Sequence, residues 1–556
     1  MIGYNRRMSE SGTLTNGEVA RVFDRIAGIM EIQGENAFKI RAYRNAVETL
    51  NTLPEPIAQI AAAGRLDDIP GFGDAIQAKV KDILGTGTTA LYERIKDQVP
   101  AGVVEMLSIP GLGAKTVRQV WQGLKIESIS ALETAAQTGK LTELPGMGEK
   151  SVQKILQSIE RYRRYSGRIR IGDALPLAES LIAAVQTFPG VSDAQIAGSV
   201  ARGQETVANI NLVAATSSPA ETLRSFTELP QVGSVAASDA HFARVVLHGG
   251  MEADLYVAPS SEFAALRDAR IGSAAHNEAR AAADRDGSVE ILRAIPLEIR
   301  ENGGEIEAAL AGTLPTLVTL ADIRGDVHAH TTASDGKTTV EQMAAAAKAR
   351  GYEYMAITDH SQSLYIANGL TPDRLRAQIA EIRALQDSLG IRIFTGSEVD
   401  IKADGSMDFD DDLLQELDFV IASAHLHNNQ DKDAQTKRII RAIENPNVDL
   451  IAHPSGRIIN RRDPFDFDFD AVVAAALRTD TALEINAAPE RLDLSDVHAR
   501  QAGAAGVKIL INTDAHSIEN YDLMRYGVLV ARRAWLTPHN VFNTRPLAEF
   551  EAWLRR

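Results

Sequence analysis

The sequence of 556 residues contains no cysteine, only 5% aromatic residues and no long hydrophobic run. The lack of cysteine excludes disulfides and thiolate metal sites, so any metal must bind through His, Asp or Glu. Without an apolar stretch of about 18 residues, we expect no membrane span, no secretory signal and a cytoplasmic protein. The length exceeds what one hydrophobic core supports and predicts several domains.

The net charge of −16 is unevenly distributed along the chain. Residues 1–172 carry 23 Lys and Arg against 19 Asp and Glu, so the acidic excess lies in the remainder. Such an acidic protein would not bind nucleic acid over its whole surface. The asymmetry instead indicates that a nucleic-acid partner would bind the first third, although ordinary variation between solvated surfaces would also produce it.

Three similar segments occur in this first third: "IPGFGDAIQAKV" (69–80), "IPGLGAKTVRQV" (109–120) and "LPGMGEKSVQKI" (144–155). Each predicts a Pro-Gly-x-Gly turn followed by an amphipathic helix, which is the pattern of a helix-hairpin-helix repeat. Glycine backbone and the free N–H groups of a first helical turn suit contact with DNA phosphates without base reading. The predicted DNA-contacting glycines are Gly71, Gly73, Gly111, Gly113, Gly146 and Gly148.

From about residue 317 onward, short apolar strands alternate with helices, which predicts a parallel (β/α)7-type barrel. Nearly every predicted strand is followed by a residue of metal-ligand type, and the ends of parallel strands converge at one mouth. Imidazole and carboxylate suit Zn, Mn or Fe, and two or three such ions activate water against a phosphoryl group. The candidate ligands are His328, His330, Asp335, His360, Glu398, His425, His453, Asp514 and His516, with His427 an open alternative on the face of His425.

The segments "DVHAHTTASDG", "ITDHS", "GSEVDI", "IAHP" and "NTDAH" resemble, in order, the motifs of the PHP (polymerase and histidinol phosphatase) superfamily. The resemblance covers residues 324–536 and implies phosphoester hydrolysis at up to three Mn²⁺ or Zn²⁺ ions, with a metal-bridging water as the nucleophile. It implies the sets His328, His330, Glu398 and Asp514 for the first ion, Glu398, His425 and His453 for the second, and Asp335, His360 and His516 for the third. The first set is the one expected to be catalytic.

The order of helix-hairpin-helix repeats, a Gly-Ser α+β unit and a PHP barrel resembles bacterial family X DNA polymerases over nearly the whole chain. The resemblance implies a multidomain α and α+β protein with a Pol β-like palm and thumb. Its partner would be gapped, nicked or 3′-recessed DNA, and a monomer is favoured. The expected domains are 1–85 (lyase-like, helix-hairpin-helix), 86–172 (fingers-like, helix-hairpin-helix), 173–260 (nucleotidyltransferase-like palm), 261–316 (thumb-like nucleotide-pocket region and linker) and 317–556 (PHP).

The segment "FKIRAYRNAV" resembles the DNA-end-binding helix of the family's lyase domain and aligns Lys39 and Tyr43 with end-binding positions. Lys79, six residues after Gly73, aligns with the lysine that forms a Schiff base with an abasic sugar. A lysine amine needs a depressed pKa to act as a nucleophile. A plain phosphate contact is therefore the alternative role for Lys79.

The nucleotide pocket matches the family only in part. Gly198, Ser199 and Arg202 fit its Gly-Ser-x-Arg-Arg motif, but Ala201 replaces the first arginine. Where the family has Tyr-Phe-Thr-Gly-Ser, this chain has "ARIGS" (269–273) and lacks both aromatic residues. Asn277 matches the family's minor-groove asparagine. The resemblance implies nucleotide contacts by Gly198, Ser199, Arg202 and Asn277.

The metal-binding positions of the palm are also altered. Asn209 and Asn211 occupy the positions of the family's catalytic Asp pair, and only Asp254 matches its third carboxylate. Two Mg²⁺ ions with a triphosphate between them need anionic oxygen ligands, and an amide offers one neutral carbonyl oxygen. We therefore expect little Mg²⁺-dependent synthesis, with Asp254 as a remaining candidate metal ligand.

These observations lead to several functional hypotheses. The first is a DNA-repair enzyme whose PHP domain is a metal-dependent 3′–5′ exonuclease, with abasic-site incision as a second candidate activity. The same resemblance allows an active Mn²⁺-dependent gap-filling polymerase with exonuclease. A small-molecule phosphatase of the histidinol-phosphate type and a non-catalytic DNA-end scaffold are the alternatives from other classes.

Overall fold

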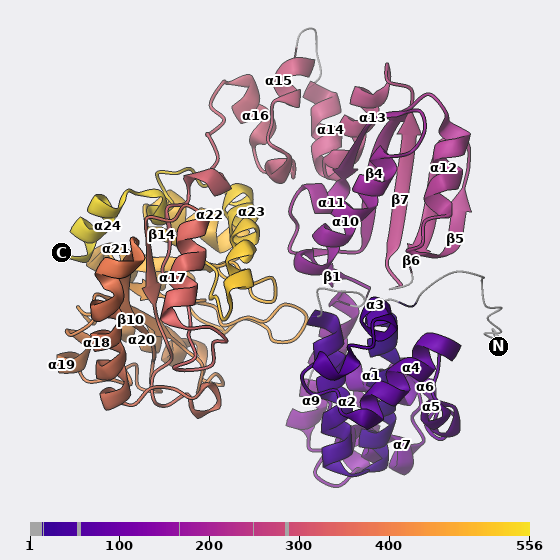
Figure 1. Cartoon of the computed structure of the whole chain (residues 1–556), viewed down its shortest axis with the longest axis horizontal. Helices are drawn as coiled ribbons and strands as arrows, with labels where there is room; N and C mark the ends of the chain where they lie inside the picture. Colours follow the sequence, from indigo (N-terminus) through magenta and orange to yellow (C-terminus); the bar gives the residue numbers. More distant parts are fainter. Residues whose placement is uncertain are drawn as a thin grey trace. The chain divides into compact units, whose positions relative to one another are not determined.

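The computed structural model describes residues 14, 16–52, 57–109, 111–165, 167–247, 250–283 and 288–555 (Figure 1). The chain divides into two compact units: Met1–Arg168 with Leu223–Asp254, and Ile169–Thr222 with Leu255–Arg556. The first 13 residues of the predicted lyase-like domain lie outside the described ranges. Among the helices that are described, none is long and apolar enough to cross a membrane.

The first unit contains a helical region with one continuous core. Apolar residues at helical spacing turn one face of each helix inward, and Phe23, Val80, Val117 and Ile159 have no exposed surface. Each such side chain stabilises the fold by about 1.5–3 kcal/mol. The helices are α1 (Asn16–Gln33), α2 (Ala37–Thr52), α3 (Ile57–Ala62), α4 (Asp74–Thr86), α5 (Ala90–Ile95), α6 (Ala101–Glu105), α7 (Ala114–Leu124), α8 (Ile129–Gln137) and α9 (Glu149–Tyr165).

Helices α4, α7 and α9 each follow one of the three Pro-Gly-x-Gly turns, which confirms the predicted helix-hairpin-helix pattern. The first glycine of each turn, at 71, 111 and 146, has a φ of 77–83°, a conformation that L-residues rarely adopt. The second glycine has an ordinary φ where it caps a helix: −69° at Gly73 and −73° at Gly113. A Cβ at any of the six glycines would meet no atom within 4 Å, so these turns face open space.

A five-stranded sheet has the order β2-β4-β7-β6-β5, and the division between the two units falls within β7. Strand β4 pairs antiparallel with β2, and helices α10, α11 and α13 pack on these two strands. The elements are α10 (Ile171–Gln186), β2 (Val191–Ala197), α11 (Gly198–Ala201), β4 (Asn209–Thr216), α12 (Pro219–Thr227), β5 (Val232–Ser238), β6 (Phe242–Leu247), β7 (Glu252–Ala258) and α13 (Phe263–Ile271), with a separate pair β1 (Ile169–Arg170) and β3 (Thr206–Val207).

Three short helices follow the sheet: α14 (Ala274–Ala283), α15 (Val289–Arg293) and α16 (Glu305–Leu310). They enclose a small core that includes Leu292, Ile299 and Ile306. A buried pair, His276 and Glu305, joins α14 to α16 at 2.6 Å. These helices lie within residues 261–316, for which a thumb-like region was predicted.

The C-terminal part of the second unit forms a parallel sheet of seven strands in the order β14-β13-β12-β11-β10-β9-β8. An isolated parallel bridge between Ala329 and Ala515 joins the segments that follow β8 and β14, so the barrel is nearly closed. The strands are β8 (Gly325–Asp326), β9 (Tyr354–Ile357), β10 (Arg392–Asp400), β11 (Phe419–Ser423), β12 (Leu450–Ile451), β13 (Ala482–Asn486) and β14 (Ile509–Asn512). This arrangement confirms the predicted (β/α)7-type barrel.

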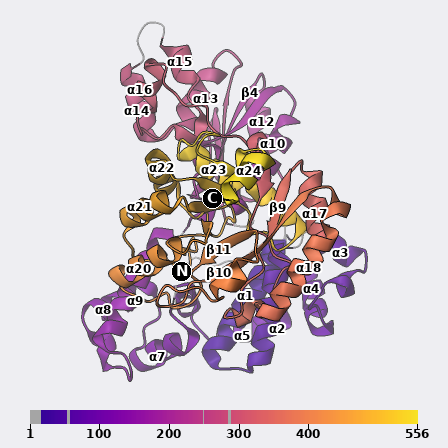
Figure 2. The ribbon, with the colours of Figure 1, turned by 90° about the vertical axis from the view of Figure 1, so that its left-hand side faces the viewer.

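Helices surround the barrel strands, as Figure 2 shows. They are α17 (Val340–Ala349), α18 (Pro372–Leu389), α19 (Asp411–Leu414), α20 (Lys432–Ile443), α21 (Phe469–Thr479), α22 (Asp496–Ala505), α23 (Met524–Arg533) and α24 (Leu547–Leu554). Phe550 and Trp553 of α24 pack against Tyr354 and Phe419, which begin β9 and β11. Helix α24 thus packs at the amino ends of these strands, and barrel enzymes place their chemistry at the opposite, carboxyl ends.

Candidate metal centre

The candidate ligands gather where the barrel strands end. His328 and His330 follow β8, His360 follows β9, Glu398 lies within the last residues of β10, and His425 follows β11. His453 follows β12, and Asp514 and His516 follow β14. Asp335 lies on the loop after His330. The structure thus brings all nine predicted residues to one end of the barrel.

One group consists of His328, His330, Glu398 and Asp514, whose ligand atoms lie within 4.8 Å of one another. His330 Nε2 lies 3.0 Å from Asp514 Oδ1, and His328 Nε2 lies 3.4 Å from Glu398 Oε2. The two histidines are buried and the Asp514 side chain is 10% exposed. This group has the composition of the first predicted ion set.

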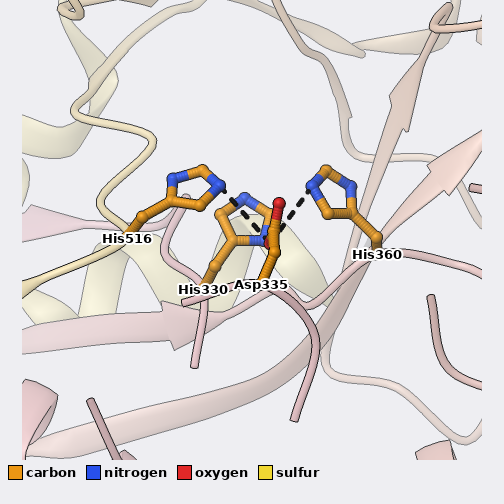
Figure 3. A group of neighbouring side chains, drawn as sticks. All are labelled: His330, Asp335, His360 and His516. Atoms are coloured by element: carbon orange, nitrogen blue, oxygen red, sulfur yellow. Dashed lines mark ion pairs between the residues drawn. The ribbon is translucent and has the colours of Figure 1, made fainter. Parts of the chain in front are cut away.

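A second group contains His330, Asp335, His360 and His516 (Figure 3). His516 Nε2 and His360 Nε2 flank Asp335 Oδ1 at 3.4 and 3.6 Å. The His330 ring stacks between the other two imidazoles, with centroid distances of 4.3 and 4.4 Å. The group contains the third predicted set, with His330 in addition.

Glu398 connects these groups to the remaining histidines. Its Oε2 lies 2.9 Å from His360 Nδ1, and its Oε1 lies 3.3 Å from His425 Nε2 and 3.0 Å from His453 Nε2. The third group of potential ligands is His360, Glu398 and His425, whereas the second predicted set had His453 in place of His360. His453 lies beside this group, with its ring centroid 5.2 Å from that of His425. His427, the open alternative, is exposed and belongs to none of the three groups found among the described residues.

The side chains at this site suit divalent metal ions. Several buried atoms make no hydrogen bond of acceptable geometry among the described residues, namely His328 Nε2, His330 Nδ1, His360 Nδ1, His453 Nδ1 and Glu398 Oε2, although His360 Nδ1 and Glu398 Oε2 lie 2.9 Å apart. Buried polar atoms are normally paired, because leaving one unsatisfied costs about 1–3 kcal/mol. Divalent cations coordinated by imidazole and carboxylate would satisfy His328 Nε2 and Glu398 Oε2, which face the first ligand group.

The carboxylates of the centre are held in their ionised form. Burial alone would raise the pKa values of Glu398 and Asp514, but nearby histidine charges outweigh burial and lower both pKa values well below the usual range. For Asp335, burial is likewise outweighed by the hydrogen bond from His516 and the charge of His360, which lower the pKa to about 2. Ionised oxygens are therefore available as ligands at neutral pH.

The histidines are affected differently according to their neighbours. Burial opposes protonation of His425 and His516, but Glu398 beside His425 and Asp335 beside His516 raise both pKa values to about 9. Burial and the charges of His360 and His516 lower the pKa of His330 to about 4. Metal ions binding at neutral pH would therefore displace protons from His425 and His516, whereas His330 is already neutral.

Sequence reasoning missed Glu484, a buried carboxylate on β13. Its Oε1 lies 2.8 Å from His328 Nδ1, and its Oε2 accepts a hydrogen bond from the His453 backbone N–H at 2.8 Å. A carboxylate on the far nitrogen of a histidine fixes the ring so that the other nitrogen faces the metal. The signal that could have revealed it is an acidic residue inside the apolar strand sequence "ALEIN".

Asp359, which precedes His360, positions the loop that carries Asp335. Its carboxylate accepts hydrogen bonds from the Thr331 backbone N–H at 2.8 Å and from the Thr331 hydroxyl at 2.6 Å. The Ser334 hydroxyl donates to the same carboxylate. These bonds hold the residue before Asp335 in place.

In the palm, Asn209 and Asn211 are hydrogen-bonded to each other. Asn211 Nδ2 donates to Asn209 Oδ1 at 3.2 Å. Two carboxylates at this distance would repel each other unless cations lay between them, whereas two amides attract. A Cβ at Gly198 would lie 2.7 Å from Asn211 Nδ2, so this glycine permits close packing of the Gly-Ser turn on β4.

The third predicted palm ligand, Asp254, is engaged by an arginine. Arg244 on β6 approaches it bidentately, with Nε 2.7 Å from Oδ1 and Nη2 2.9 Å from Oδ2. The Asp254 side chain is 1% exposed. The guanidinium thus supplies the positive charge that a metal ion would supply at this carboxylate.

The residues predicted to contact a nucleotide also make contacts within the chain. Arg202 Nε lies 2.8 Å from Glu301 Oε1, and its Nη1 donates to the Ile271 carbonyl at 2.5 Å. Asn277 Nδ2 donates to the Ala269 carbonyl at 2.9 Å. The Ser199 carbonyl accepts from the Gln204 N–H at 3.0 Å, within the turn that follows Gly198.

In the lyase-like region, Lys39 is exposed and Lys79 is half-buried. Lys79 Nζ donates to the Ala75 carbonyl at 3.0 Å and lies 5.8 Å from the centre of the Tyr43 ring. That ring is stacked on Phe23 at a centroid distance of 5.9 Å and belongs to the core. The three predicted DNA-end residues therefore include one exposed cation, one half-buried cation and one core aromatic.

A nearly closed parallel barrel with His and carboxylate clusters at its carboxyl ends, together with the match to the PHP domain family, identifies a metal-dependent phosphoesterase. The chain matches the PHP domain family over residues 326–486, a helix-hairpin-helix domain family over 14–89 and a SAM-like helix-hairpin-helix tandem over 103–161.

One relative is similar to this chain over nearly its whole length, and others match part of it. The "DNA polymerase/3'-5' exonuclease PolX" of Bacillus subtilis (strain 168) is 37% identical over 97% of this chain and 99% of its own length. Probable phosphatases of Shewanella sediminis and Syntrophotalea carbinolica are 31% and 28% identical over 40% and 39% of this chain, and over 90% of their own length in both cases. The chain therefore belongs to the PolX family of DNA polymerases/3′–5′ exonucleases, as the order of its motifs predicted.

Proposed function

We propose that this protein acts in DNA repair by removing nucleotides from 3′ ends, and that the reaction takes place in the PHP barrel. The single observation that carries the proposal is the convergence of His and carboxylate side chains around Glu398 in a chain that also contains helix-hairpin-helix repeats. Its substrates would be gapped, nicked or 3′-recessed DNA. Incision at abasic sites is a further activity of the same class.

The nine predicted residues would hold Mn²⁺ or Zn²⁺, with Glu398 shared between ions because both of its oxygens face histidines. The ions would supply a water nucleophile activated near neutral pH and positive charge for the phosphoryl oxygens. The protein's own contribution is to hold these ligands in fixed orientations. Glu484 does so for His328, and Asp359 does so for the loop that carries Asp335.

The helix-hairpin-helix turns would hold the DNA backbone. Gly73 and Gly113 have ordinary φ values and open space around them, so no contact with the described residues requires glycine at these positions. Close approach of an external backbone provides a reason for glycine there. The helix N-termini at these turns have no side-chain cap, and their N–H groups can bind phosphate oxygens.

Mg²⁺-dependent synthesis would be impaired. The Asn209–Asn211 hydrogen bond and the Arg244–Asp254 pair satisfy the three metal-ligand positions of the palm without a cation. The palm and the region after it would then serve mainly to hold DNA, with any nucleotide bound through Gly198, Ser199 and Asn277. In the lyase-like domain, a phosphate contact is the simpler role for Lys79, since its amine already donates to a backbone carbonyl.

The alternatives differ in substrate. Probable phosphatases match about 40% of the chain, which supports a small-molecule phosphatase, but the full-length similarity to an exonuclease favours DNA. A non-catalytic scaffold with a structural metal would use the same ligand atoms, and it differs from the proposal in predicting no release of nucleotides.

One comparison tests the proposal. The full chain with Mn²⁺ is given a 3′-recessed duplex or histidinol phosphate, and release of mononucleotides or of phosphate is measured. Mononucleotide release from DNA is expected to dominate. Release of phosphate from histidinol phosphate alone would refute the exonuclease proposal.

A further inference from the structure

One arginine reaches the metal centre without a close partner. Arg491 lies between β13 and α22, and its Nε is 3.8 Å from Asp514 Oδ2, which is beyond hydrogen-bond distance. Its Nη1 is buried and has no hydrogen-bond partner among the described residues. Buried guanidinium N–H groups are normally paired. Arg491 therefore lies beside the first ligand group, and its Nη1 is left to donate to another acceptor.

The backbone that carries Arg491 is held firmly. Arg457 Nε donates to the Arg491 carbonyl at 2.9 Å. The following residue, Leu492, has a φ of +43°, a strained conformation for a leucine. Asp493 is fully buried and accepts from the Ser455 N–H at 3.1 Å. The position of Arg491 is thus determined by several contacts, and the strain lies beside the candidate site.

The positive charges around Arg491 favour binding of an anion there. Asp514 already faces His328 and His330, so its negative charge is shared. Arg462 is a second cation near Arg491. Burial and the charge of Arg491 both lower the pKa of Arg462. When divalent cations bind Asp514 and its neighbours, the positive charge at this edge increases further. A phosphoryl group would balance it and would accept from the unpaired Nη1.

We propose that Arg491 binds a non-bridging phosphoryl oxygen of the substrate beside the metal centre. The planar guanidinium fits phosphate geometry, and its charge does not depend on pH in the neutral range. This inference rests on the proposed phosphoester hydrolysis. It adds a substrate-positioning residue that supplies no metal ligand.

Direct binding of inorganic phosphate tests the assignment. The Mn²⁺-loaded full chain is titrated with phosphate by calorimetry for wild type, Arg491→Met, Arg491→Lys and the control Arg461→Met. Arg461 is exposed on a neighbouring loop and carries the same charge. Manganese content is measured for each variant, and KM for a 3′-recessed duplex is determined in parallel.

We expect Arg491→Met to weaken phosphate binding about 10- to 100-fold and to raise KM, with unchanged manganese content. Arg491→Lys should recover part of the loss, and Arg461→Met should resemble wild type. The assignment is overturned if wild type binds no phosphate, if Arg491→Met binds it normally, if that variant loses manganese, or if Arg461→Met is equally weakened. Because phosphate binding is measured without DNA, a failure of the exonuclease proposal would appear separately, as wild type that binds phosphate but releases no nucleotides.

Discussion

Glu398 and Asp514 are ionised although they are almost fully buried, because histidines from several strands face them. A buried carboxylate with such neighbours is costly to the fold unless each charge is matched. The metal-free centre achieves this match partly with protonated histidines. Metal ions would replace those protons, so ligand positions and proton binding are linked at the scale of single residues.

Glu484 provides a test of ligand positioning. Glu484→Gln keeps the size of the side chain but removes the charge that orients His328. We expect metal affinity to fall about 10- to 100-fold, as is usual when such a carboxylate is removed. Manganese titration of the metal-free protein measures the change. Glu549→Gln, on α24 at the other end of the barrel, is the matched control and should bind manganese as wild type does. Unchanged affinity in Glu484→Gln would show that His328 does not need this partner.

Metal binding should depend on pH in a defined window. The pKa values of His425 and His516 are raised from 6.5 to about 9, so protons occupy both below pH 9 and compete with metal. Metal affinity should therefore increase between pH 6.5 and 9, by up to about tenfold per unit for each proton displaced, and level off above.

The metal-free fold should respond in the opposite direction. A raised histidine pKa contributes stability that is fully present below pH 6.5 and is lost as pH rises through 9.

The pH dependence of metal binding can be measured directly. Calorimetry in two buffers of different ionisation enthalpy would detect the protons released on Mn²⁺ binding at pH 7. Equal affinity at pH 7 and pH 9, without proton release, would contradict this account.

At the scale of elements, the helix-hairpin-helix turns should carry DNA affinity. Lys115 and Lys150 are exposed at the first turns of α7 and α9. Replacing each with Ala should weaken DNA binding for all sequences and reduce the slope of log affinity against log salt by about 1 per lysine. Lys437→Ala, at an exposed lysine on α20 of the barrel, is the matched control. If Lys437→Ala has the same effect, the binding is general electrostatic attraction and not a property of the turns.

The palm strands make a second test at this scale. Asn209→Asp with Asn211→Asp should not restore Mg²⁺-dependent primer extension while Arg244 occupies Asp254. Adding Arg244→Ala removes this ion pair, and we expect extension to increase at least about tenfold over the double variant. Primer extension on gapped DNA measures both. Full activity of the double variant would show that Arg244 does not block the site.

Sequence patterns predicted the elements well because those patterns are local. The Pro-Gly-x-Gly turns and the apolar strands followed by His or Asp each fall within about a dozen residues. Glu484 and Arg491 were missed because their partners, His328 and Asp514, belong to other strands. The Arg244–Asp254 pair joins neighbouring strands, and no local spacing distinguishes it from a surface ion pair. The chemistry around a ligand depends on tertiary contacts that a single sequence does not display.

For the whole molecule, the charge asymmetry has a simple interpretation. The slightly basic first third contains the repeats that match helix-hairpin-helix families, and the acidic remainder contains the barrel. Metal ions would provide the positive charge that the barrel needs only at its centre. DNA affinity and phosphodiester hydrolysis would thus reside in different parts of one chain, and variants should separate them.

The central claim is that the chemistry of this protein resides in the barrel around Glu398. The most direct measurement follows a 5′-labelled primer on gapped DNA, with Mn²⁺ or Mg²⁺ and with or without deoxynucleotides, for wild type and Glu398→Ala. We predict that wild type shortens the primer with Mn²⁺. Glu398→Ala should bind the DNA, but it should neither shorten the primer with Mn²⁺ nor extend it with Mg²⁺. Digestion by Glu398→Ala at the wild-type rate, or Mg²⁺-dependent extension as fast as digestion, would contradict the claim.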